Sequence, residues 1–280
     1  MTICIAAICD FDTDVKNKIL LCADRAVSTN IQFEGGEPKI KKITDWCYIM
    51  QSSNHSLMTD LILERVRTKT RDKDLTTVLA IVELLKNECI AYKSECIERD
   101  VLIKFQAVIG KLSVQPEAFV KIVSEEVNRY QATKFDFVAD FIVAGIESNE
   151  EAHIYCVNQD GEYYLGDSLG YLTIGSGGDL AFLQMTRYIY SRKVTMAAAI
   201  TLVYLAKKIS ERAVGVGNST DFYILHLMGQ PLKPVLYDLG QNAKCMKALD
   251  ETYNTIGNQE KDVIDKASVQ VYNVFFEPQS

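Results

Sequence analysis

The opening of the chain constrains the fold more than any other stretch. Residues 3–9 form a nearly unbroken apolar run, and residues 19–23 form a second one after a polar turn at 10–14. A strand that is exposed to water on one face alternates apolar and polar residues, whereas a strand covered on both faces reads as a continuous apolar run. We therefore expect two strands of a sheet that is covered on both faces.

Further strands and helices follow from the same periodicity. Apolar runs predict strands at 46–50, 137–146, 152–157 and 222–225, with one more at 235–237. A first helix follows cap residues at 51–54 and carries Leu57, Leu61 and Ile62, and a second begins near Leu75 with a stripe at Val78, Leu79, Val82, Leu85 and Cys89. Consecutive helices after the opening strands favour a layered α+β sandwich over a doubly wound sheet.

The remaining predicted helices lie after residue 115. We expect a helix beginning at Pro116, where the missing N–H of proline costs least, and helices at 179–192 and at Thr195–Arg212. The last of these is apolar on several faces, which indicates burial between the sheet and a further layer. Beyond Gly240 the sequence predicts helices at 243–254 and 259–270.

Composition excludes several classes of protein. The chain has 280 residues, of which 48% are apolar and 24% charged, so it can bury a substantial core. Its net charge of −7 gives no electrostatic footprint for nucleic acid. No segment resembles a signal peptide or is apolar for long enough to span a membrane, which predicts a cytoplasmic protein. The eight cysteines form no CxxC pair and the histidines lie far apart, so we expect reduced thiols and no metal site.

The second residue carries the chemistry that a hydrolase needs. If Met1 is removed, Thr2 supplies both a hydroxyl and a free α-amine, and the amine can act as general base for the hydroxyl. A free α-amine titrates near ~7.7–8, and a neighbouring ammonium group lowers that pKa. A small second residue is nevertheless common in any protein, so its position alone indicates little.

Several segments resemble a proteasome-type β subunit of the N-terminal-nucleophile (Ntn) hydrolase superfamily, in the same order. They are Thr2–Ala7, Ile19–Ala26, Pro38–Ile43, Phe141–Ile146 and Ile174–Gly178, and residues 206–225 resemble a bacterial branch of that superfamily. The resemblance covers most of residues 2–100 and 135–228. It implies an α+β fold, a four-layer α/β/β/α sandwich of two antiparallel sheets. We therefore expect a domain at 2–228, a helical insertion at about 101–134, and a C-terminal extension at 229–280.

The same resemblance implies a complete site. Thr2 is the nucleophile, the Lys39 ammonium acts beside it, and Asp24 holds that lysine. Ser176 bonds the terminal amine, and a backbone N–H at Ser52 forms the oxyanion hole. Neither a metal nor a cofactor is implied. Read singly, Asp24 is a turn residue that pairs with Arg25, and Lys39 is one charge of a basic cluster with Lys41 and Lys42.

The implied function is hydrolysis of a peptide or amide bond by a threonine peptidase. The resemblance further implies a homo-oligomer, as a ring or a stack, and leaves any unfoldase partner open. Two alternatives remain: an inactive assembly subunit that keeps Met1, and an amidase for a small molecule. One segment departs from the family pattern, since Glu211–Gly217 offers no match for its second aspartate and serine. Glu211 or Asp221 could substitute there.

Overall fold

Two antiparallel sheets form the centre of the molecule. The computed structural model describes residues 2–10, 17–25, 27–28, 32–33, 38–105, 116–133, 137–229 and 232–276. Within these residues the chain builds two five-stranded sheets and a separate two-stranded hairpin. Every pair of neighbouring strands is antiparallel. The polar turn expected at 10–14 and the glycines at 35 and 36 lie largely outside the described residues.

The strands of each sheet come from both halves of the chain. The first sheet consists, in spatial order, of β10 (Tyr171–Ile174), β1 (Cys4–Cys9), β2 (Lys18–Asp24), β11 (Thr220–Met228) and β12 (Lys233–Asp238). The second consists of β5 (Ile40–Lys42), β6 (Cys47–Ser53), β7 (Ala139–Ile146), β8 (Ala152–Asn158) and β9 (Tyr163–Leu165). The hairpin is β3 (Val27–Ser28) with β4 (Gln32–Phe33).

The opening strands are covered on both faces, as their sequence predicts. Along β1, Cys4, Ala6 and Ile8 belong to the core between the two sheets. The intervening Ile5 and Ala7 belong to a second core, under the helices of the first sheet. Successive side chains of a strand point to opposite faces, so a strand that contributes to both cores must be apolar throughout.

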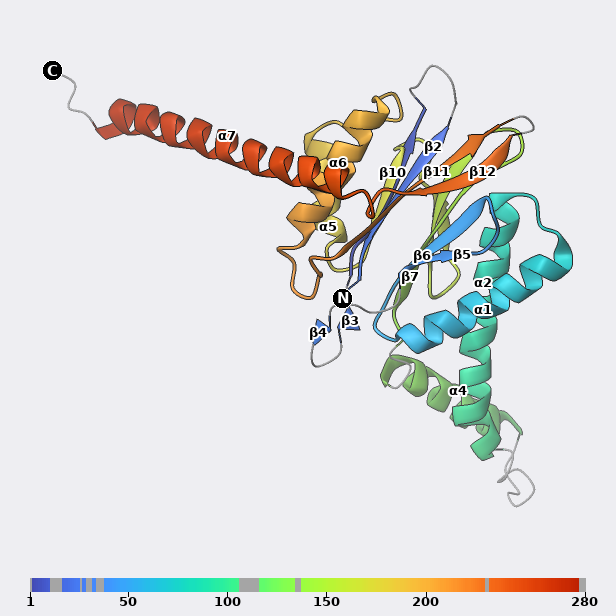
Figure 1. The fold of residues 1–280 in the computed structure, drawn as a ribbon. Coiled ribbons are helices and arrows are strands. Elements are labelled where there is room, and N and C mark those ends of the chain that lie inside the picture. The colour runs from blue at the N-terminus through green and yellow to red at the C-terminus, as the bar shows by residue number, and fades with distance from the viewer. Residues whose placement is uncertain are drawn as a thin grey trace.

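Helices close both outer faces of the sandwich. In Figure 1, α1 (Ser56–Lys73) and α2 (Val78–Ile97) lie on the second sheet, while α5 (Gly178–Arg187) and α6 (Met196–Ser210) lie on the first. Three buried apolar clusters therefore separate four layers. This confirms the predicted α+β class and the α/β/β/α sandwich.

The apolar stripe of α1 differs from the prediction. Leu57 is 84% exposed and Leu61 is 46% exposed, whereas Ile62 is buried as predicted, together with Leu63 and Val66. The expected cap residues 51–53 belong to β6, and the helix instead follows His55. The predicted stripe therefore meets the sheet only through Ile62, because tertiary packing decides which apolar side chains of a helix face the core.

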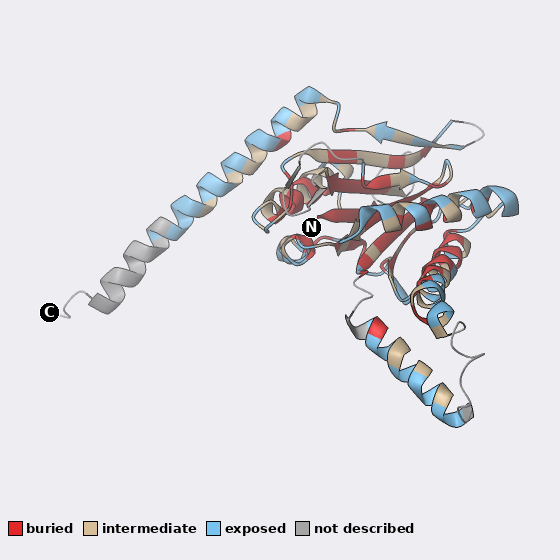
Figure 2. Ribbon diagram, turned by 90° about the horizontal axis from the view of Figure 1, so that it is seen from below, coloured by how far each residue is buried: buried red, intermediate tan, exposed pale blue. Residues whose placement is uncertain are grey.

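Two further parts extend from the sandwich. The five-residue π-helical turn η1 (Glu98–Leu102) continues α2, and α4 (Pro116–Thr133) follows after a segment outside the described residues. At the other end, α7 (Ala243–Phe276) is one continuous helix where the sequence predicts two. The expected break falls at Gly257, but one glycine inside a helix costs only ~1 kcal/mol. Figure 1 shows α7 projecting from the body, and in Figure 2 the part of this helix whose burial is described is mostly exposed.

Candidate active site

Antiparallel pairing brings the ends of three strands together around Thr2. Thr2 precedes β1, and Cys4 at the start of β1 pairs with Ala23 near the end of β2 and with Ile174 at the end of β10. Asp24 follows Ala23, and its backbone N–H donates to the Ile3 carbonyl at 3.2 Å. The start of β1 therefore lies between Asp24 and the turn that follows β10. Thr2 is buried in this position.

Lys39 reaches the same point from the second sheet. It lies immediately before β5, and its backbone carbonyl accepts a hydrogen bond from the Gln51 N–H at 3.2 Å. The Lys39 Nζ lies 2.6 Å from Asp24 Oδ1 and also donates to Thr2 Oγ1. The side chain is largely buried, which strengthens its interaction with both partners relative to an exposed pair.

Asp24 is the hub of this centre. Its Oδ1 accepts hydrogen bonds from the Thr2 hydroxyl at 2.5 Å and from the Ile3 N–H at 3.0 Å. Its Oδ2 accepts from the Gly217 N–H at 2.9 Å. A fully buried carboxylate is tolerated when its oxygens are hydrogen-bonded and a cation is paired with it, and here both conditions hold. The structure therefore brings together Thr2, Asp24 and Lys39.

The turn after β10 fixes the backbone of Thr2. Its N–H donates to Ser176 Oγ at 3.2 Å, and its carbonyl accepts from the Gly177 N–H at 3.2 Å. Gly175 has φ of +95°, and a Cβ at this position would lie 2.3 Å from the Thr2 carbonyl oxygen. Only glycine allows the turn to approach so closely. Ser176 thus lies where the sequence predicts it, beside the nitrogen of Thr2.

Ser52 lies on β6, the strand next to β5. It pairs with Asp140 of β7. Its neighbour Gln51 contacts the site, since the Cys4 thiol donates to the Gln51 carbonyl at 3.5 Å. Among the residues that the structure describes, no hydrogen bond joins Ser52 to Thr2. Its role in an oxyanion hole therefore stays a prediction.

The two carboxylates considered as substitutes have other partners. Asp221 is buried on β11 and binds Arg25, with Arg25 Nε at 2.7 Å from Asp221 Oδ1. Glu211 binds Lys207 and Lys208 at the end of α6. Neither contacts Thr2 in the part of the chain described. The hydrogen bond from the Gly217 N–H to Asp24 could not be predicted from the sequence, because a backbone donor requires no particular side chain.

Cys4 does not compete with Thr2 as a nucleophile. Its side chain lies against the site, but burial raises the pKa of the thiol to about 12, although the Lys39 charge acts in the opposite direction. A thiol with this pKa is protonated at neutral pH, and the thiolate is the reactive form. The hydroxyl of Thr2, which contacts both Lys39 and Asp24, is therefore the better placed nucleophile.

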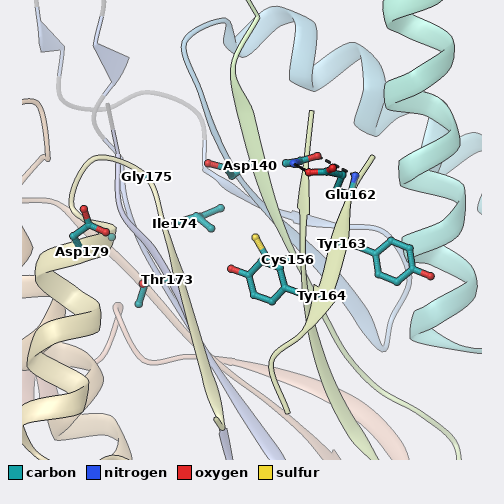
Figure 3. Close-up of a pocket in the computed structure, with 11 residues that line it drawn as sticks. Asp140, Cys156, Glu162, Tyr163, Tyr164, Thr173, Ile174, Gly175 and Asp179 are labelled. Atoms are coloured by element: carbon teal, nitrogen blue, oxygen red, sulfur yellow. Dashed lines mark hydrogen bonds between the residues drawn. The ribbon is translucent and has the colours of Figure 1, made fainter. Parts of the chain in front are cut away.

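A pocket of about 390 Å³ adjoins this centre. Gly175, which touches the Thr2 carbonyl, forms part of its wall, as does Asp140, the pairing partner of Ser52. Figure 3 shows carboxylates around it from three elements: Asp140 on β7, Glu162 before β9 and Asp179 on α5. The described residues that line the pocket include no lysine, arginine or histidine. Burial raises the pKa of the Asp140 carboxyl.

No group of histidine, cysteine, aspartate and glutamate side chains among the described residues could hold a metal ion. None of the described helices is both long and apolar enough to cross a membrane. The eight cysteines are all free thiols.

One family model matches part of the chain. Residues 109–225 match the model of the family described as Proteasome subunit. The matched segment spans β7, β8, β10 and most of β11, and it includes Ser176 but not Thr2, Asp24 or Lys39. A search of curated proteins finds no match. Two five-stranded antiparallel sheets flanked by helices agree with the α/β/β/α sandwich of proteasome subunits.

Proposed function

We propose that this chain is a threonine-type Ntn amidohydrolase, a proteasome-like peptidase whose nucleophile is Thr2 after removal of Met1. The observation that carries the proposal is the geometry at Thr2 Oγ1, which contacts both the Asp24 carboxylate, at 2.5 Å, and the Lys39 ammonium. The match of residues 109–225 to proteasome subunits supports it, because that family includes threonine peptidases. We also propose that the chain belongs to a bacterial branch of the superfamily, which residues 206–225 resemble.

The proposed reaction has two steps. Thr2 Oγ1 attacks the substrate carbonyl while the freed α-amine accepts the hydroxyl proton. The proton then passes to the leaving nitrogen as the C–N bond breaks, which leaves an ester on Thr2. Water, with the α-amine again as base, hydrolyses that ester. The Lys39 ammonium stabilises negative charge developing on Oγ1, and Asp24 fixes the ammonium in place. A backbone N–H near Ser52 would hold the oxyanion.

The acidic pocket favours peptide substrates with a basic side chain. Its lining holds Asp140, Glu162 and Asp179, and it touches the backbone of the nucleophile through Gly175. A negatively charged cleft attracts cationic groups and rejects anionic ones. Assembly of copies into a ring or stack is part of the proposal by analogy with proteasome subunits.

Hydrolysis assays with variants at Thr2 test the proposal. Fluorogenic peptides with a basic, neutral or acidic residue before the scissile bond are compared with small acyl-amides. We expect hydrolysis of the basic peptides, loss of activity in Thr2→Ala and partial activity in Thr2→Ser, which keeps a hydroxyl. Activity that is equal in Thr2→Ala would refute the nucleophile. Hydrolysis restricted to the small amides would favour the amidase.

An inactive assembly subunit is the second candidate, because Glu211–Gly217 lacks the family's second aspartate and serine. It predicts no hydrolysis of any substrate and a retained Met1. The amino terminus of the purified protein therefore distinguishes the two functions without knowledge of the substrate.

A further inference from the structure

A fully buried lysine lies near the C-terminal end of α6, behind the candidate site. No part of the Lys207 side chain is exposed, although lysine is among the residues least often buried. Its ammonium donates to Glu211 Oε1 and, at 2.7 Å, to the Asn218 carbonyl oxygen. An ammonium group removed from water is destabilising unless it is paired, and the Glu211 carboxylate and the Asn218 carbonyl provide that pairing.

The second of these contacts leads directly to the site. Asn218 follows Gly217, whose N–H donates to Asp24 Oδ2 at 2.9 Å. Both residues lie in the segment that joins α6 to β11, and Val216 within it is buried against the same core as α6. The Gly217 amide and the Asn218 carbonyl lie on neighbouring residues of one short segment, so a contact that holds the carbonyl limits how far the amide can move.

We propose that Lys207 is a positioning residue for the Thr2 centre. By holding the Asn218 carbonyl, its ammonium keeps the Gly217 amide on Asp24 and so keeps the carboxylate oriented toward Thr2 and Lys39. The inference rests on the proposed function, since it assigns Lys207 to the same reaction. The positioning role also involves Glu211–Gly217, the segment in which this sequence departs from the family pattern, because Glu211 and Gly217 make two of the contacts.

Three variants separate positioning from stability. Lys207→Met removes the ammonium but keeps an unbranched side chain. Lys207→Met/Glu211→Gln also removes the carboxylate that would otherwise be left without its buried partner, and we expect it to recover stability. Lys208→Met is the matched control: Lys208 is the next residue of α6 and binds the other oxygen of Glu211 at 3.0 Å.

Two readouts are measured on each variant. Amide hydrogen exchange at Gly217, followed by NMR, reports its hydrogen bond whether or not the protein is active. Steady-state kinetics with the peptide hydrolysed by the wild type give kcat and KM. For both variants at Lys207 we expect faster exchange at Gly217 and a kcat lower by about tenfold or more, with KM within about twofold. Lys208→Met should match the wild type in both readouts.

Two results would overturn the inference, and they differ. Unchanged exchange at Gly217 in the Lys207 variants, or full kcat in the double variant, would show that Lys207 only stabilises the fold. Absence of Thr2-dependent hydrolysis in the wild type would refute the proposed function, and the positioning role with it. The two failures can be told apart, because the wild-type protein is an active enzyme if only the positioning role is wrong and is inactive if the proposed function is wrong.

Discussion

At the scale of single residues, Asp24 connects the groups around Thr2. Its Oδ1 meets the Thr2 hydroxyl and the Lys39 ammonium, and its Oδ2 meets the Gly217 amide. A carboxylate held from several directions has little freedom to turn, so the cation paired with it is also fixed. Preorganised charge of this kind costs no reorganisation when the hydroxyl ionises.

Replacement of Lys39 by methionine should therefore remove catalysis. The variant keeps a long side chain but no charge beside Thr2 Oγ1, and we expect kcat to fall by about 100-fold or more. The control is Lys42→Met at the end of β5, where the side chain is exposed and pairs with Asp45 at the surface. Steady-state kinetics on folded protein provide the measurement. A kcat near that of the wild type in Lys39→Met would contradict the assigned role.

Asp140 gives a prediction about pH. Burial raises the pKa of this carboxyl above its usual value of about 3.9, because the ionised form is less well solvated in the folded chain than in the unfolded one. The ionised form is penalised at neutral pH, and the penalty vanishes below the pKa of the unfolded chain. Asp140→Asn should therefore raise Tm near pH 7, with a gain that disappears toward pH 3. Thermal unfolding across this range tests it, and a gain that is independent of pH would contradict it.

At the scale of elements, the turn after β10 has the strictest requirement. A Cβ on Gly175 would lie 2.3 Å from the Thr2 carbonyl oxygen, and its φ of +95° disfavours every other residue. Gly175→Ala should lower both Tm and kcat, because either the turn or the nucleophile must move.

Gly257→Ala is the matched control for that substitution. This glycine lies inside α7, and a Cβ there would meet nothing within 4 Å. Alanine favours helix over glycine by ~1 kcal/mol, so Tm should stay equal or rise, with unchanged kcat. Equal effects of the two substitutions on kcat would contradict the close approach at Gly175.

The elements also show how far the sequence alone could lead. Continuous apolar runs predicted the strands that are covered on both faces, and the resemblance to proteasome-type β subunits predicted the residues that lie around Thr2. The buried face of α1 was predicted only in part, since Ile62 is buried but Leu57 and Leu61 are exposed. Helical spacing fits more than one stripe, and only tertiary packing selects among them. The Gly217 amide and the contact of Lys207 with Asn218 could not be predicted, because both use backbone groups of a loop.

At the scale of the whole molecule, surface composition bears on assembly. Several large apolar side chains are exposed on α5 and beside it, namely Phe182, Leu183 and Ile189. The apolar helix α6, for which the sequence predicts burial between the sheet and a further layer, is covered within the chain by the first sheet and by Cys245, Met246 and Leu249 of α7. The exposed apolar side chains on and beside α5, by contrast, are typical of a surface that contacts another protein.

We therefore expect the purified protein to exceed the mass of a single chain, 31.5 kDa. Native mass spectrometry or light scattering measures the mass of the assembly. Leu183→Glu should reduce it, since it places a charge on the exposed face of α5, whereas Lys121→Glu on α4 should not. A wild-type protein that is monomeric at all concentrations would contradict the ring or stack.

The central claim depends on the first residue of the mature chain. Mass spectrometry of the purified protein determines whether the chain begins at Met1 or at Thr2. We predict a chain that begins at Thr2 with a free α-amine, since only that amine can serve as base for the Thr2 hydroxyl. A chain that retains Met1 in full would contradict the mechanism.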